Sequence, residues 1–225
     1  FKLYDTYGFP SEIIQEIAVE KNLKLDLDTF NNLMKSQKKQ SRKYSKFDLS
    51  DTSFIDSSQN TIFSGYLDYE LSSKVIGIYH DNKKIKNFDK PDIELLVVVE
   101  STPFYPEGGG QISDIGKMEN DSCSLLVTNV QKINNVIVHQ VTIESGSISI
   151  GDDIFLKINT KRREKIAANH SSTHLLNQAL RDVLGEHVEQ KGSLVTDKYL
   201  RFDFSHNKTL TLEEIRKIET IISFE

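Results

Sequence analysis

The sequence has little cysteine, little proline and no long apolar run. Its single cysteine, Cys123, excludes an intramolecular disulfide and a zinc site built only from thiolates. No apolar stretch approaches the roughly 18 residues of a membrane-spanning helix, and no signal peptide is visible. We therefore expect a cytoplasmic protein without a membrane partner. With 225 residues, of which 37% are hydrophobic and 27% charged, the chain has the composition of one large or two modest globular domains.

The net charge argues against general nucleic-acid binding. It is −5 at pH 7, from 28 basic and 33 acidic residues, so we expect no DNA partner held by the whole surface. Residues 31–47 differ, because they contain six basic residues, no acidic one, and a spacing that places most of the bases on one side of a helix. A solvated helix face is the simpler interpretation, and a local nucleic-acid contact is the alternative. The six residues are Lys35, Lys38, Lys39, Arg42, Lys43 and Lys46.

Hydrophobic spacing in the first part of the chain is helical. Residues 11–45 carry apolar side chains at helical intervals, with Asp26 or Asp28 as the expected N-cap. Residues 48–60 are polar and form the expected linker. The chain begins with Phe1 instead of methionine, and its last residues stand within an apolar pattern. From these ends we expect a piece excised from a longer protein.

The middle of the chain predicts a β-barrel. From Thr61 the apolar spacing changes to two, and short strands alternate with turn residues. Residues 93–99 are apolar enough for a strand buried on both faces. We therefore expect a small antiparallel barrel over residues 61–159.

The last part of the chain predicts helix, strand and helix. Residues 161–184 and 209–223 have apolar residues at helical spacing, and residues 199–204 alternate like a strand. Residues 190–192 predict a polar turn, where the side chain of Gln190 could line a pocket. Together with the barrel, these elements give an expected fold class of α+β.

Two histidines in the longer predicted helix form the first candidate site. His170 and His174 stand four residues apart, so their imidazoles lie one turn apart on one side of the helix and can reach a single metal ion. Both fall at the edge of the apolar face, whereas core-filling histidines would lie in its middle. Core packing is the alternative, because two ligands hold zinc poorly and the chain offers no obvious third.

A glycine-rich loop is the second candidate. Residues 102–111 read TPFYPEGGGQ. Three successive glycines, Gly108, Gly109 and Gly110, let the backbone approach a ligand closely, and the Gln111 amide can donate and accept hydrogen bonds. A wide barrel turn is the alternative interpretation.

A run of basic residues precedes the histidines. Lys161, Arg162 and Arg163 would place charge that attracts phosphate beside a metal site. The alternative is an ordinary solvated start of a helix.

Several motifs occur in a recognisable order. The first ten residues, FKLYDTYGFP, are followed by the glycine loop, which continues through Asp114 and Gly116. The segments 169–174, 190–193 and 201–204 come next. In this order the motifs resemble the alanyl-tRNA synthetase family, and the resemblance spans nearly the whole chain.

The resemblance implies a division of the chain. Residues 1–47 would be the helical end of the tRNA-recognition region, and residues 48–60 a linker. Residues 61–159 would be the barrel with its glycine loop, and residues 160–225 a truncated first part of the editing core.

The resemblance also implies an activity. The family's editing site hydrolyses the ester that wrongly joins serine or glycine to alanine tRNA, with zinc held by His-x-x-x-His and a later Cys-x-x-x-His. His170 and His174 match the first half, and no Cys-x-x-x-His occurs in this chain. We therefore expect this chain alone to hold zinc weakly and to be inactive. Gln190 matches a position in the family's pocket, and Thr173 is a further expected contact.

The remaining partners and cofactors follow from the same resemblance. The acceptor arm of alanine tRNA would contact the loop 108–111 and the residues 161–163. ATP and magnesium would be used by an aminoacylation domain outside this chain. Contacts with the tRNA are further expected from Lys35, Lys39 and Arg42.

Three other interpretations stay open. The chain could be a tRNA-binding module without catalysis, in which the histidines only pack. It could be a free-standing editing protein, although such a protein would not be expected to carry the first ten residues. Finally, the tripeptide Gly109-Gly110-Gln111 is shared with hydrolases of the release-factor type.

Overall fold

A computed structural model describes residues 18, 21, 23, 25, 26, 29, 30, 52–56 and 58–224. The chain divides into two compact units, Phe1–Thr52 and Ser53–Glu225. In the first unit, the Asp26 carboxylate accepts hydrogen bonds from the Thr29 amide at 2.8 Å and from the Thr29 hydroxyl at 2.6 Å. Thr29 is helical, so the expected N-cap at Asp26 is confirmed. The basic residues Lys35, Lys39 and Arg42 lie outside the described residues.

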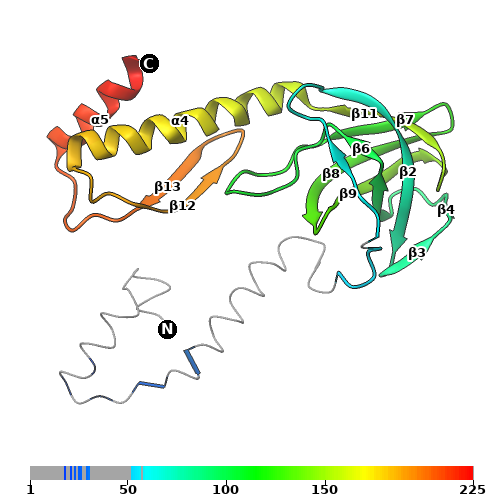
Figure 1. Cartoon of the computed structure of the whole chain (residues 1–225), viewed down its shortest axis with the longest axis horizontal. Helices are drawn as coiled ribbons and strands as arrows, with labels where there is room; N and C mark the ends of the chain where they lie inside the picture. The colour runs from blue at the N-terminus through cyan, green and yellow to red at the C-terminus, as the bar shows by residue number, and fades with distance from the viewer. Residues whose placement is uncertain are drawn as a thin grey trace. The chain divides into compact units, whose positions relative to one another are not determined.

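The second unit contains a closed antiparallel barrel (Figure 1). Its six strands follow one another in the order β11-β7-β8-β9-β5-β2, and β11 pairs again with β2 to close the ring. A further strand, β3, pairs with the last three residues of β2. The strands are β2 (Glu70–His80), β3 (Lys83–Ile85), β5 (Glu94–Val99), β7 (Gly116–Asn120), β8 (Cys123–Ile133), β9 (Val136–Gly146) and β11 (Asp153–Ile158).

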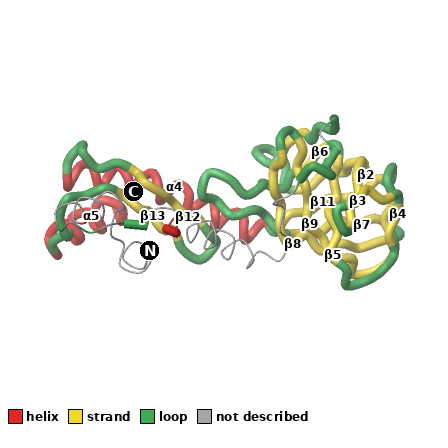
Figure 2. The backbone as a smooth tube through the Cα atoms, turned by 90° about the horizontal axis from the view of Figure 1, so that it is seen from below, coloured by secondary structure: helices red, strands yellow, loops and turns green. Residues whose placement is uncertain are grey.

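Two short strand pairs form sheets of their own. β1 (Ile62–Phe63) pairs in parallel with β6 (Ser101–Thr102), and β4 (Asn87–Phe88) pairs antiparallel with β10 (Ile148–Ser149). In Figure 2 the strands of the barrel gather at one end of the unit. The predicted α+β class and antiparallel barrel are therefore confirmed.

Alternating side chains explain why these segments close around a core. In β11 the side chains of Ile154, Leu156 and Ile158 are buried and those between them are more exposed, as expected for strands with one face inward. β5 is buried along almost its whole length, as its apolar sequence predicts. The turn between β2 and β3 places Asp81 and Asn82 at φ 47° and 60°, a left-handed conformation that suits a two-residue hairpin.

The rest of the unit is built on a long helix, α4 (Thr160–Leu184), and a shorter one, α5 (Leu212–Phe224). A hairpin of β12 (Gln190–Val195) and β13 (Leu200–Phe204) lies beside α4 (Figure 1). Thr211 and Glu214 form a capping box at the start of α5: the Thr211 amide donates to Glu214 at 2.8 Å and the Glu214 amide to Thr211 at 3.2 Å. A second apolar core joins these elements through the buried residues Ala179, Leu180, Val188 and Ile218.

One prediction in this region is wrong. Residues 190–192 do not form a turn, because Gln190 begins β12 and pairs with Phe204, while Gly192 pairs with Asp203 across a bulge. Cross-strand pairing with β13 overrides the polar composition of the segment. None of the helices that the structure describes is long and apolar enough to span a membrane.

Candidate functional site

The first turn of α4 is tied to the barrel by Arg163. Its guanidinium forms an ion pair with Asp114, with Nε 3.0 Å from both carboxylate oxygens. It also donates to the carbonyl oxygens of Gly65 at 2.7 Å and Pro103 at 3.0 Å. The side chains of Arg163 and Asp114 are only 11% and 3% exposed. A guanidinium with this many internal acceptors joins the helix to the barrel and has few donors left for a phosphate.

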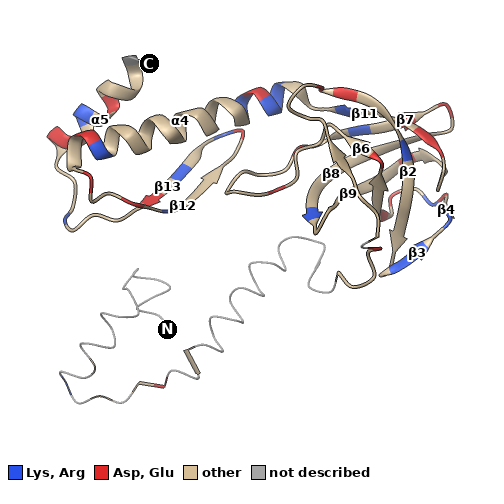
Figure 3. Ribbon diagram, in the orientation of Figure 1, with Lys and Arg blue, Asp and Glu red and all other residues tan. Residues whose placement is uncertain are grey.

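The two other basic residues at this helix start differ in their surroundings. Arg162 donates to the Ser113 carbonyl at 2.6 Å and approaches Asp197 at 3.6 Å, so it too is engaged inside the protein. Lys161 is exposed. Figure 3 shows basic and acidic residues together in the first turns of α4. Of the three, Lys161 is the residue best placed to contact a phosphate, and that contact stays a prediction.

The histidine pair lies further along α4. The ring centroids of His170 and His174 are 5.3 Å apart and the rings are tilted by 31°, so the two imidazoles are neighbours on one side of the helix, as the spacing predicts. Nδ1 of His170 lies 2.6 Å from the side-chain oxygen Oε1 of Gln111. The glycine loop and the histidine pair therefore form one site, although the two residues are 59 positions apart.

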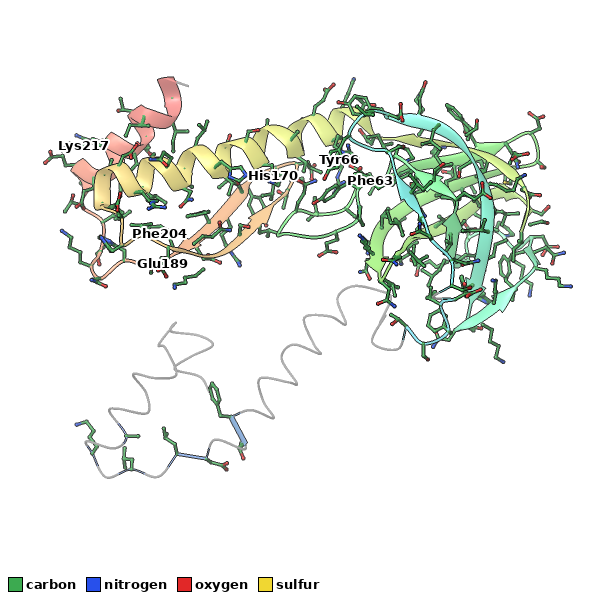
Figure 4. All side chains as sticks on the ribbon, viewed as in Figure 1. Phe63, Tyr66, His170, Glu189, Phe204 and Lys217 are labelled. Carbon is green, nitrogen blue, oxygen red and sulfur yellow. The ribbon has the colours of Figure 1, made fainter. Side chains whose placement is uncertain are left out.

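The glycine loop reaches this site because strand β12 holds it. The Val195 amide donates to the Gly110 carbonyl at 2.7 Å, and the Ile112 amide donates to the Val195 carbonyl at 3.1 Å. The hairpin that holds the loop is in turn bound to α4, because the Asn169 side chain donates to the carbonyl of Thr196, the residue after β12, at 2.7 Å. In Figure 4, His170 lies where the loop and the hairpin meet α4.

Comparison with known proteins shows the family of the chain. The family model described as "tRNA synthetases class II (A)" matches residues 1–162. An alanine–tRNA ligase of Blochmanniella floridana is 40% identical over 225 residues, which is 99% of this chain and 25% of that ligase. The chain belongs to the alanyl-tRNA synthetase family. It spans about a quarter of the length of this curated relative.

Membership in the synthetase family confirms the resemblance seen in the sequence and directs attention to two further residues. Thr173 is buried, and its hydroxyl donates to the Asn169 carbonyl at 2.9 Å, which leaves only oxygen lone pairs for another partner. Gln190 is exposed at the start of β12. It lies five residues before Val195, or about 16 Å along an extended strand. No described hydrogen bond joins Gln190 to either histidine, so its pocket role stays a prediction.

The ring nitrogens of the two histidines are suitable zinc ligands, but two ligands are fewer than a zinc site needs. Imidazole nitrogen is a common zinc ligand, and the contact of Nδ1 with Gln111 leaves Nε2 of His170 available. Among the residues that the structure describes, no group of three or more His, Cys, Asp or Glu side chains could hold a metal ion. Two imidazoles supply at most two of the four ligands of a tetrahedral zinc site, so zinc binding by His170 and His174 stays a prediction.

Sequence reasoning missed three residues that build the site. In the sequence, Asp114 stands out only as part of a motif and Asn169 only as a neighbour of His170, yet both fix α4 in place. Ser193 packs against the loop at Gly110. An acid that follows a glycine loop and precedes a pair of arginines is the one signal that could have suggested the Asp114 pair.

Proposed function

We propose that this chain is part of a cytoplasmic alanine–tRNA ligase that also edits its product. The whole protein would join alanine to its tRNA with ATP and magnesium, in a domain outside this chain. This region would supply the first half of a site that hydrolyses serine or glycine wrongly esterified to alanine tRNA. The proposal rests on the family membership and, above all, on the adjacent imidazoles of His170 and His174.

Such an editing site answers a physical need. A pocket shaped for alanine excludes larger side chains, but glycine is smaller and serine adds only a hydroxyl. Differences of ~1–3 kcal/mol in binding are too small for accurate protein synthesis. A second site that tests the esterified product supplies the missing discrimination.

Each residue of this chain has a distinct part in the proposed hydrolysis. His170 and His174 would hold zinc, which when bound supplies polarisation of the ester carbonyl or of a water molecule. Gln190 would hydrogen-bond the amino acid, and Thr173 would offer an oxygen lone pair. The loop 108–111 would lie near the acceptor end of the tRNA, and Lys161 would contact its phosphates.

The surroundings of the histidines support this proposal over simple core packing. His174 is exposed and His170 is partly exposed, whereas the second apolar core is formed by other residues of α4, among them Ala179 and Leu180. The family match begins at residue 1, which favours the synthetase over a free-standing editing protein. Because no Cys-x-x-x-His occurs in the sequence, we expect the chain by itself to be inactive.

Deacylation by the full-length protein tests this function. Serine-charged alanine tRNA is mixed with the wild-type enzyme, with His170→Ala, and with His80→Ala as a control histidine in the barrel. We expect His170→Ala to lower the deacylation rate by about 100-fold or more, as for loss of a strong electrostatic stabiliser, while alanine attachment is retained. Equal rates in wild type and His170→Ala would instead support a tRNA-binding module without catalysis.

A further inference from the structure

Gln111 is bound to a ring nitrogen of His170, and this contact gives the glycine loop a role of its own. We infer that Gln111 is a positioning residue: its side-chain oxygen accepts a hydrogen bond from Nδ1–H of His170, which fixes the ring and leaves Nε2 as the nitrogen that can bind a metal ion. The consequence for hydrolysis rests on the proposed function, whereas the assignment of the tautomer rests only on the contact itself.

The chemistry of the contact defines the tautomer. Oε1 of Gln111 lies 2.6 Å from Nδ1 of His170, and an amide oxygen can only accept a hydrogen bond. Nδ1 must therefore carry the proton in the neutral ring, and the lone pair is on Nε2. In the part of the chain that the structure describes, Nε2 of His170 has no hydrogen-bond partner. The buried side-chain amide of Gln111 therefore engages Nδ1 of His170, and Nε2 is left without a partner among the described residues.

Backbone hydrogen bonds of the loop hold the Gln111 side chain in place. The Gly108 amide donates to the Gln111 carbonyl at 3.1 Å and the Gln111 amide to the Gly108 carbonyl at 3.0 Å, which closes a tight turn. The bonds to Val195 then fix this turn against β12. Gln111 is only 8% exposed. Its side chain is therefore held in one orientation and is poorly placed to reach a distant substrate.

Gly109 and Gly110 are required in the loop for different reasons. Gly110 has φ 82°, and a Cβ atom there would lie 2.5 Å from the carbonyl oxygen and from Oγ of Ser193. No side chain fits there unless the loop moves away from β12. Gly109 has φ 60° and no atom within 4 Å of its Cβ position, so it is required only by its backbone conformation. Close approach of the loop to β12 thus depends on Gly110.

A histidine that binds a metal through one ring nitrogen usually donates a hydrogen bond from its other ring N–H to a neighbouring oxygen, and this bond orients the ring. Loss of such a partner typically weakens metal affinity by about 10- to 100-fold. Gln111 occupies this position for His170. The loop therefore couples the barrel, in which it is rooted, to the helix that carries the ligands.

The tautomer is measured by nitrogen NMR of histidine side chains in the metal-free 225-residue chain, at a pH where the rings are neutral. We expect His170 to be the Nδ1–H form in wild type and in Gln111→Glu, which keeps an acceptor oxygen. Gln111→Leu should shift it toward the Nε2–H form. Gln178→Leu makes the same replacement at an exposed position of α4 and should leave His170 as in wild type.

The loop variants provide a second comparison. Gly110→Ala should shift the His170 tautomer as Gln111→Leu does, because the loop must leave β12. Gly109→Ala strains the same loop without a clash and should keep the wild-type tautomer. The inference is overturned if wild-type His170 is already the Nε2–H form, which would mean that the Gln111 amide is turned round, or if Gln111→Leu changes nothing. The wild-type spectrum alone decides the first point, even if a variant fails to fold.

Zinc affinity of the full-length protein connects the contact to function. Competition with a chelator should show 10- to 100-fold weaker binding in Gln111→Leu than in wild type, with Gln111→Glu close to wild type. Equal affinity in all three would overturn the positioning role. If His170→Ala kept full deacylation, the proposed function would fail, but a tautomer that depends on Gln111 would still stand, so the two failures can be told apart.

Discussion

Replacing Asp114 with asparagine tests how α4 is held on the barrel. The substitution keeps the shape of the side chain and an oxygen that can accept from the Tyr105 amide, which now donates to Asp114 at 2.8 Å. It removes the negative charge that faces the Arg163 guanidinium. Because Arg163 is 11% exposed and Asp114 3% exposed, the remaining positive charge would stay largely inside the protein.

The expected cost follows from that burial. Removing one partner of a buried ion pair typically destabilises a protein by about 3–5 kcal/mol, since the other charge is left uncompensated. Arg163 keeps the carbonyl oxygens of Gly65 and Pro103 as acceptors, so we expect the lower end of that range. For a domain of this size, ~3 kcal/mol corresponds to a melting temperature lowered by roughly 6–12 °C.

Urea denaturation and thermal melting of the 225-residue chain measure the effect. The matched control is Asp153→Asn, because Asp153 pairs with Lys74 at 3.0 Å at an exposed site of the same barrel, where an ion pair contributes little. In the double variant Arg163→Met, Asp114→Asn, the total loss should be smaller than the sum of the single losses. If Asp114→Asn were as stable as Asp153→Asn, the pair would not hold the helix, and the reasoning from burial would be refuted.

Three other residues give independent predictions. Burial lowers the pKa of His139 from 6.5 to about 4. Between pH 6.5 and pH 4 the unfolded chain therefore binds up to one proton more than the folded chain. As the pH is lowered through this range, the free energy of unfolding should fall by up to about 1.4 kcal/mol per pH unit. His139→Gln should remove this slope in urea titrations, and identical slopes would contradict the prediction. Thr211→Ala removes the N-cap of α5 and should destabilise that helix by about 1 kcal/mol; unchanged amide exchange in α5 would argue against it. Burial raises the pKa of the Cys123 thiol, so alkylation should be much slower in the folded than in the unfolded chain, and equal rates by mass spectrometry would refute this.

Local patterns predicted most of the fold, because each depends on residues close in sequence. The cap at Asp26 forms between residues three positions apart. The barrel strands follow from alternating side chains, which report only which face is buried. The prediction of a turn at residues 190–192 is wrong because the polar composition of this segment gives no sign that it pairs with β13, although β13 itself is predicted by its alternating residues.

The neighbouring position of the two histidines was predicted from the sequence, but their partners in distant segments were not. The spacing of His170 and His174 fixes their separation, because both lie on one helix. The partner of His170 is Gln111, 59 positions away, and the partner of Arg163 is Asp114, 49 positions away. A basic run has the same sequence whether it faces solvent or a buried acid. Contacts between distant segments depend on how the loop, the hairpin and the helix pack together, which no local pattern specifies.

The zinc content of two forms of the protein decides whether His170 and His174 are half of a metal site. The 225-residue chain and the full-length protein are purified with equal access to zinc and analysed for bound metal. We expect far less than one zinc ion per molecule in the chain, about one in the full-length protein, and loss of that ion in full-length His174→Ala. Near-stoichiometric zinc in both wild-type proteins, or zinc retained without His174, would contradict this expectation.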